Sequence, residues 1–326
     1  LAEYAALHGA AGVIDLSFRS RICLAGADRA RFLHGQVTND IKRLGVGQGC
    51  YAALVTTKGK MESDLNVYAL QDELLLDFEP GLTEKVSQRL EKFIVADDVQ
   101  IVDVMPHYGL LSVQGLKAEA VVRAIGLFIE IPAKAFDSVK FSDATLGEIY
   151  LMNHARLNTS GFDLFVPINS LGAVADKLIF SARQTGGGVC GWQAFETARI
   201  EAGIPRFGAD MDETNLPLEC GIESRAVSYQ KGCYIGQEVI NRVHVMGQVT
   251  KELRGLRLED GLAALPVKGD KLLQGDKEVG YVTSAVRSPV KGNIALGYVR
   301  REANAVGTEL VLAGKSGVKV VSFGRV

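Results

Sequence analysis

The sequence predicts an α+β protein that ends in a small β-barrel, and three observations support this prediction. Residues 49–80 alternate apolar runs with the turn sequences KGK and QDE, a pattern typical of antiparallel strands. Later strand-like and helix-like segments lack the regular alternation of a parallel sheet, which favours antiparallel α+β layers. From about residue 249, short apolar segments are separated by Gly, Asp and Pro without a helical period, as expected for a barrel of about six strands.

The other elements are placed by their periodicity. The segment SRICLAG (residues 20–26) alternates as a strand, and Asp28 is a candidate N-cap for a helix with Leu33, Val37 and Ile41 on one face. Further elements are expected at five places: a helix around Val86 to Ile94, helices near 116–125, 170–184 and 191–202, and a hairpin over 147–166.

Length, charge and hydropathy exclude several classes of protein. At 326 residues the chain is too long for one hydrophobic core and fits two or three domains. Its formal net charge of −2 provides no global basic field, so direct binding to nucleic acid or to anionic lipid is not expected. No run approaches the roughly 18 apolar residues that a membrane-spanning helix needs, so no contact with a membrane is expected.

The cysteines and the N-terminus predict the cellular context. Five cysteines without a C-x-x-C pair argue against a disulfide framework and favour a reducing compartment. The first twelve residues lack a basic region, so no secretory signal is expected, although the chain begins without Met and a removed leader stays open. We expect a monomer in the cytoplasm, or in the mitochondrial matrix of a eukaryote.

Several motifs have simple structural explanations. Gly186, Gly188 and Gly191 satisfy the dinucleotide pattern G-x-G-x-x-G, but a helix is expected before them, so a helix–loop–helix connection is favoured. The five histidines are scattered without H-x-x-x-H spacing, and no metal site is predicted. The turn KGK at 58–60 is most simply a solvated hairpin turn, although it could also hold an anionic tail.

Two residues stand out as carriers of chemistry. Glu201 lies at an expected helix end before Gly203 and Pro205, where a structural role is favoured on position alone. Cys233 has polar neighbours on both sides in YQKGCYIGQE (229–238), and a helix beginning at Gln237 would stabilise its thiolate. Spacing alone leaves a reactive thiol and a buried structural cysteine equally open.

Four segments resemble a known superfamily. ARIEAGIPRFGADMDETNLPLE (198–219), GVIDLSFRSRICLAGADRARFLHGQVTNDI (12–41) and GYVTSAVRSPVKGNIALGYV (280–299) resemble the glycine-cleavage T-protein, a tetrahydrofolate-dependent aminomethyltransferase. KGCYIGQEVINRV (231–243) instead resembles the YgfZ branch of that superfamily, whose signature K-G-C-Y-x-G-Q-E is complete here. The resemblance spans nearly the whole chain.

The resemblance implies a fold and a ligand. Residues 1–48 and 143–240 would form a discontinuous α+β domain, residues 49–142 an inserted α+β domain, and residues 241–326 a C-terminal β-barrel that closes a three-domain ring. The implied ligand is tetrahydrofolate or a one-carbon-substituted folate. The implied role is assembly or repair of iron–sulfur clusters, including those of enzymes that thiolate tRNA, with iron–sulfur proteins or assembly factors as partners.

The same resemblance assigns roles to residues. Glu201 matches the T-protein glutamate that accepts the N–H donors of the pterin. Lys58, Lys60 or Arg242 would bind the glutamyl tail of the folate. Lys231, next to the motif cysteine, and Tyr234, which could stack on the pterin or plug a domain junction, complete the expected folate site.

Asp64 and Cys233 are the expected catalytic residues. Asp64 falls where T-proteins carry two adjacent aspartates, and Ser63 replaces the first of them, so Asp64 keeps the catalytic carboxylate only if the second of the pair is the catalytic one. The T-protein arginine cluster before the barrel is replaced here by QKGCYIGQE, which argues against glycine cleavage. Cys233 is therefore expected to be the functional thiol.

Three functions follow from this reading. The preferred one is a tetrahydrofolate-binding accessory protein of iron–sulfur cluster metabolism that acts through Cys233. The alternatives are a tetrahydrofolate-dependent aminomethyltransferase, which Asp64 and RIEAG favour, and a non-catalytic scaffold that binds a client protein. The sequence leaves open whether the protein turns over a substrate.

Overall fold

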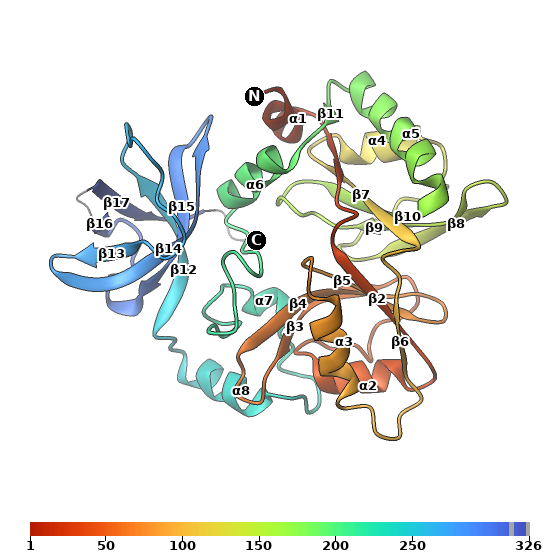
Figure 1. Ribbon diagram of the computed structural model, residues 1–326, viewed down its shortest axis with the longest axis horizontal. Coiled ribbons are helices and arrows are strands. Elements are labelled where there is room, and N and C mark those ends of the chain that lie inside the picture. The colour runs from red at the N-terminus through yellow and green to blue at the C-terminus, as the bar shows by residue number, and fades with distance from the viewer. Residues whose placement is uncertain (313–315, 324–326) are drawn as a thin grey trace. The chain divides into compact units, whose positions relative to one another are not determined.

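A computed structural model describes residues 1–312 and 316–323 of the chain. Their strands form two open sheets and a closed barrel (Figure 1). The chain divides into two compact units. The first unit comprises Leu1–Leu54, Ser63–Phe195 and Arg225–Ile235, and the second comprises Val55–Glu62, Glu196–Ser224 and the residues from Gly236 onward. No helix in the described ranges is long and apolar enough to cross a bilayer.

A five-stranded sheet has the strand order β3-β4-β5-β2-β6. Its strands are β2 (Ser20–Ala25), β3 (Gly49–Val55), β4 (Met61–Ala69), β5 (Leu74–Phe78) and β6 (Gln100–Asp103). Helices α2 (Arg29–Gln36) and α3 (Thr83–Glu91) pack their apolar residues with those of one sheet face into a buried core. Because side chains alternate along a strand, Ile22 and Leu24 enter this core, while Arg21 and Cys23 point to the other face.

A six-stranded sheet in the first unit has the strand order β11-β1-β7-β10-β9-β8. Its strands are β1 (Gly12–Asp15), β7 (Tyr108–Gln114), β8 (Ser138–Asp143), β9 (Gly147–Asn153), β10 (Gly161–Pro167) and β11 (Gly188–Val189). Helices α4 (Ala118–Ala124) and α5 (Leu171–Gln184) cover its core, the 3₁₀ turn η1 (Ile168–Ser170) leads into α5, and α1 (Ala2–Gly9) precedes β1. The helix α5, not a strand, precedes the glycine run, and a side chain at Gly187 would collide with the carbonyl oxygen of Ala11 at 1.9 Å.

The C-terminal barrel in the second unit closes in the order β12-β15-β14-β13-β16-β17. Its strands are β12 (Lys251–Leu258), β13 (Lys271–Gln274), β14 (Lys277–Ser288), β15 (Gly292–Arg300), β16 (Glu309–Leu312) and β17 (Ser316–Val321), with the 3₁₀ turn η2 (Arg301–Ala303). Three helices lie between the α+β sheets and the barrel in sequence: α6 (Trp192–Glu201), α7 (Glu223–Ala226) and α8 (Gln237–Met246). The predicted fold, two α+β layers and a six-stranded C-terminal barrel, is confirmed.

One local prediction was wrong, and the predicted N-cap position is confirmed without its side-chain hydrogen bond. Helix α2 ends at Gln36, so Val37 and Ile41 lie beyond it; Val37 is extended and forms a bridge with Leu54, a contact that suits its β-branched side chain. Asp28 occupies the N-cap position, but its side chain accepts from the backbone N–H of Asp98 at 3.0 Å instead of capping α2. A long-range strand contact thus takes Val37 out of the helical pattern. A loop contact with Asp98 takes up the Asp28 side chain.

The sheets group the strands across the predicted domain boundaries. Strand β2 lies before residue 49 yet pairs with β5 and β6, and β7 lies before residue 142 yet pairs with β1 and β10. The predicted boundaries at 48 and 142 therefore do not coincide with the limits of the sheets. The division into three domains stays a prediction.

Candidate active site

The Asp64 carboxyl on β4 is half satisfied. Its Oδ2 accepts a 2.8 Å hydrogen bond from the Tyr51 hydroxyl on the adjacent strand β3. Its Oδ1 is buried and has no hydrogen-bond partner among residues 1–312 and 316–323. Burial, together with the nearby charge of Glu79, raises the pKa of Asp64 to about 6. A half-buried carboxyl with this pKa is equipped to accept a hydrogen bond or a proton from a ligand near neutral pH.

Ser63 does not share this position. Side chains alternate along β4, so Ser63 shares a face with the core residues Leu65 and Val67, opposite the face of Asp64. Its buried hydroxyl donates to the backbone carbonyl of Asp64 at 3.1 Å. The residue that replaces the first T-protein aspartate thus lies on the core side, and Asp64 is the one that meets Tyr51.

Tyr51 and Arg225 are site residues that the sequence analysis missed. The Arg225 guanidinium lies 5.2 Å from the centre of the Tyr51 ring. The Asn39 amide donates to the backbone carbonyls of Tyr51 at 2.8 Å and of Arg225 at 2.9 Å, which ties Arg225 in the short helix α7 to strand β3. The meander over 49–80 contained the signal for Tyr51, because a hairpin about the KGK turn brings residues 51 and 64 onto neighbouring strands.

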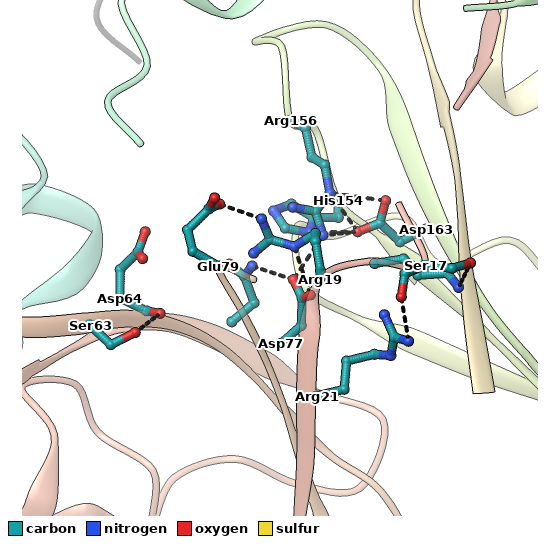
Figure 2. A network of polar contacts seen from close by, with 12 residues as sticks. Ser17, Arg19, Arg21, Ser63, Asp64, Asp77, Glu79, His154, Arg156 and Asp163 are labelled. Carbon is teal, nitrogen blue, oxygen red and sulfur yellow. Dashed lines mark hydrogen bonds and ion pairs between the residues drawn. The ribbon is translucent and has the colours of Figure 1, made fainter. Parts of the chain in front are cut away.

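A chain of buried ion pairs lies beside Asp64 (Figure 2). Arg19 donates to Glu79 and, at 2.8 Å, to Asp77. Asp77 also accepts from Arg156 at 2.9 Å and from the Asn66 amide at 2.9 Å. Burial alone would raise the pKa of Asp77, but the guanidinium groups of Arg19 and Arg156 outweigh it and hold that pKa well below its usual range.

The network continues into the six-stranded sheet. Arg156 pairs with Asp163 on β10 at 2.7 Å, and Asp163 contacts Nδ1 of His154 at 2.9 Å. The same nitrogen lies 3.0 Å from the Tyr68 hydroxyl on β4. Burial would raise the pKa of Asp163, but Arg156 and His154 lower it to about 2. These contacts join the two sheets of the first unit and place a network of buried charges beside Asp64.

The cysteine motif combines an exposed thiol with two buried neighbours. Cys233 is exposed, whereas three of the other cysteines are buried and Cys50 is half-buried. Lys231 is buried, and its ammonium group donates to the backbone carbonyls of His34, Val37 and Asn39, at 2.6 Å and 2.8 Å for the last two. All three of its N–H donors are thus used within the protein, at the C-terminal end of α2, where helix carbonyls lack partners.

Tyr234 packs beside Lys231. The Lys231 ammonium lies 4.8 Å from the centre of the Tyr234 ring. Burial lowers the pKa of Lys231 to about 8 and raises the pKa of Tyr234 to about 12. The Tyr234 hydroxyl is buried and has no hydrogen-bond partner in the described part of the chain. The structure thus makes Lys231 and Tyr234 a packed support under an exposed Cys233; their predicted contact with folate stays a prediction.

The other predicted folate-binding residues belong to the second unit. Glu201 is the last residue of α6 and is buried, and its backbone carbonyl accepts from the Lys291 ammonium at 2.9 Å. Lys60 donates to the backbone carbonyl of Thr214 at 2.7 Å, and Arg242 is exposed on α8. Their assignment to the folate site stays a prediction.

Helix α6, which carries Glu201, is linked to the barrel through Asp210, which pairs with Arg199 and accepts a hydrogen bond from β14. Arg199 is buried and pairs with Glu196 at 2.9 Å and with Asp210 at 2.7 Å. Asp210 accepts in turn from the Thr283 hydroxyl on β14 at 2.6 Å. The end of α6 is therefore held in a defined position. Within the described ranges, no three His, Cys, Asp or Glu side chains are grouped to hold a metal ion.

Comparison with known proteins agrees with this architecture. The GCVT N-terminal domain family matches residues 1–231, and the glycine cleavage T-protein C-terminal barrel domain family matches residues 251–321. The chain belongs to the glycine cleavage T-protein family. Residues 232–250, which include Cys233, lie between the two matched ranges.

Relatives of this T-protein family member are named aminomethyltransferase. One from Halalkalibacterium halodurans is 28% identical over 95% of this chain and 84% of its own, and one from Rubrobacter xylanophilus is 29% identical over 92% and 79%. The fold is that of the crystal structure of glycine cleavage system aminomethyltransferase T from Bartonella henselae, with a TM-score of 0.85 at 23% identity, covering 98% of this chain and 87% of the other.

Proposed function

We propose that the protein is a tetrahydrofolate-dependent one-carbon transferase of the aminomethyltransferase type, with Asp64 as its acid–base group. The observation that carries the proposal is the Asp64 carboxyl: Tyr51 holds it through Oδ2, and its buried Oδ1 has no hydrogen-bond partner in the described part of the chain. The names of the relatives point in the same direction. The transferase, the first alternative to the accessory protein of iron–sulfur metabolism in the sequence analysis, is thus preferred here.

The residues fit a reduced folate. Its ring N–H groups and amines are donors, and the unpartnered Oδ1 of Asp64 is an acceptor of the matching kind. When bound, tetrahydrofolate supplies the nucleophilic nitrogens that take up a one-carbon unit. Asp64, with a pKa of about 6, is suited to hold or release a proton at such a nitrogen near neutral pH. The Tyr51 hydroxyl keeps the carboxyl oriented while this happens.

Transfer is tested with an aminomethylated lipoyl carrier protein and tetrahydrofolate, following the formation of methylene-tetrahydrofolate. We expect Asp64→Asn to lower the rate by about 10²-fold or more, a typical contribution of general acid–base catalysis. Cys233→Ala is the matched control and should keep the wild-type rate. A wild-type protein without transfer activity, or an active Asp64→Asn, contradicts the proposal.

Folate binding is tested separately by calorimetric titration of tetrahydrofolate into wild type and Glu201→Ala. Loss of binding in the variant supports the assignment of Glu201 to the pterin. Binding that is unchanged in Glu201→Ala removes that residue from the site but leaves the role of Asp64 intact.

A second candidate function rests on the exposure of Cys233. Its thiol is the only exposed one among the five cysteines, all of which are described, and it sits in the complete K-G-C-Y-x-G-Q-E signature. This favours an accessory role in iron–sulfur cluster assembly or repair, with clients such as tRNA-thiolating enzymes. In cells that lack the protein, Cys233→Ala should then fail to restore iron–sulfur enzyme activity while Asp64→Asn restores it. The opposite pattern supports the transferase.

A further inference from the structure

Phe323 is a buried aromatic side chain that follows strand β17 and packs against two glycines. Its ring lies on the backbone of Gly255 in β12, where a Cβ atom would lie only 2.4 Å from Cδ2 of the ring. Its own Cβ lies against the turn after α6, because a Cβ atom at Gly203 would be 2.9 Å from it. Gly203 also has a φ of +71°, which glycine adopts without strain. A side chain at either glycine would therefore collide with Phe323.

Phe323 is connected to Glu201 in two ways. Glu201 is the last residue of α6, and Gly203, which Phe323 contacts, lies two residues further along the chain. The backbone carbonyl of Glu201 accepts a hydrogen bond from the Lys291 ammonium at 2.9 Å, and the same ammonium lies 5.3 Å from the centre of the Phe323 ring. All four residues belong to the second unit. Phe323 thus touches the turn that ends α6 and lies beside the cation that binds the Glu201 carbonyl.

A cavity adjoins the Phe323 ring. Its volume is about 50 Å³, and besides Phe323 its lining includes Gly203, Cys220, Leu253, Arg254, Gly255 and Ser322. Loss of the ring would join its volume to this cavity and leave an open space between β12 and the turn after α6. Such a space is filled only in part by relaxation of its walls, and that relaxation moves the backbone around it. The turn after α6 is the wall that carries Glu201.

We propose that Phe323 is a positioning residue for Glu201: its ring fixes the turn after α6 and thereby the place of the Glu201 carboxyl against a bound pterin. The inference rests on the proposed function, in which Glu201 accepts the N–H donors of the pterin. Binding groups work only when they are held within about 0.5 Å of the productive geometry, so a shift of the turn weakens binding although Phe323 itself need not touch the ligand. The role concerns the binding of folate and not the proton transfer by Asp64.

The test is calorimetric titration of tetrahydrofolate into the full chain, at a temperature where circular dichroism shows each variant folded. Phe323→Ala should bind at least about tenfold more weakly than wild type, the loss expected when one hydrogen bond to a charged group is misaligned. Phe323→Leu, which keeps an apolar side chain in the space, should recover most of the affinity. Val306→Ala changes an exposed residue of the same cavity lining and should bind as wild type does.

A second pair of variants leaves Phe323 in place. Gly255→Ala should displace the ring and weaken binding as Phe323→Ala does, whereas Gly317→Ala, at a barrel glycine with open space around it, should not. A Phe323→Ala protein that melts at a lower temperature but binds with the wild-type affinity has lost only stability, and it overturns the positioning role alone. Unchanged binding in Glu201→Ala also overturns that role and leaves the transfer reaction standing. A wild-type protein that binds no tetrahydrofolate overturns both the role and the proposed function.

Discussion

Asp64 and Asp77 are acidic residues on neighbouring strands of one sheet; Asp64 is half-buried and Asp77 is fully buried, and their hydrogen-bond partners differ. Asp77 is bonded by two arginines and an asparagine, and its pKa is held well below the usual range. Asp64 has one tyrosine hydroxyl as partner, and its pKa is raised to about 6. Asp77 is the more buried of the two and yet has the lower pKa, so the difference comes from the number and charge of their partners. A satisfied carboxylate stabilises the fold, and a half-satisfied one is available for chemistry.

The largest effect is expected for Asp77→Asn, on the free energy of unfolding. The change leaves Arg19 and Arg156 buried with one carboxylate fewer, and we expect a loss of about 3 kcal/mol in the free energy of unfolding. Urea unfolding followed by circular dichroism measures it. Asp72→Asn, at an exposed turn position, is the control and should change stability by no more than about 0.5 kcal/mol. A loss below about 1 kcal/mol for Asp77→Asn would show that the network is not structural.

Asp64→Asn should have the opposite effect on stability. The pKa of Asp64 is about 6 in the folded protein and near 4 when unfolded, so the folded state binds the proton more tightly. Wild-type stability therefore falls as pH rises from about 4 to 6, by up to about 3 kcal/mol. Asp64→Asn removes this pH dependence. The stability of the variant relative to wild type should therefore rise as the pH increases from about 4 to 6. A difference that is constant with pH contradicts the raised pKa.

Tyr51→Phe removes the hydroxyl that donates to Oδ2 of Asp64. The hydroxyl stabilises the carboxylate, so its loss should raise the pKa of Asp64 above 6, by about one unit for a hydrogen bond of about 1 kcal/mol. Carbon-13 NMR of the aspartate carboxyls measures the titration. Ser63→Ala is the control, because Ser63 lies on the other face of β4 and should leave the titration unchanged.

The smallest effect is expected for Arg225→Gln. The exposed guanidinium lies over the Tyr51 ring, and exposed contacts of this kind contribute about 0.5–1 kcal/mol. Stability measured by urea unfolding should change by no more than this. A loss above about 2 kcal/mol would place Arg225 in the structural network with Asp77 instead of at the edge of the candidate site.

The sequence predicted much of the fold because its signals are local. The turns KGK and QDE mark the strands β3, β4 and β5, and the Gly-punctuated segments after residue 249 mark the barrel. Prediction failed where distant contacts compete with local pattern: Val37 leaves the helical period to bridge Leu54. The grouping of β2 with β5 and of β1 with β7 was also beyond local pattern, because strand pairing depends on residues far apart in sequence.

For the candidate site, too, the residues could be predicted from the sequence but their surroundings could not. From the sequence alone we predicted the candidate residues Asp64, Glu201 and Cys233 and recognised the family motifs around them. The partners of the carboxylates, and with them their pKa values, come from the tertiary structure. Asp64 meets Tyr51 across a hairpin, whereas Asp77 is paired with arginines 58 and 79 residues away in sequence. A carboxylate's pKa is set by burial and by the charges around it. These are properties of the folded arrangement, so they become visible only when distant segments have come together.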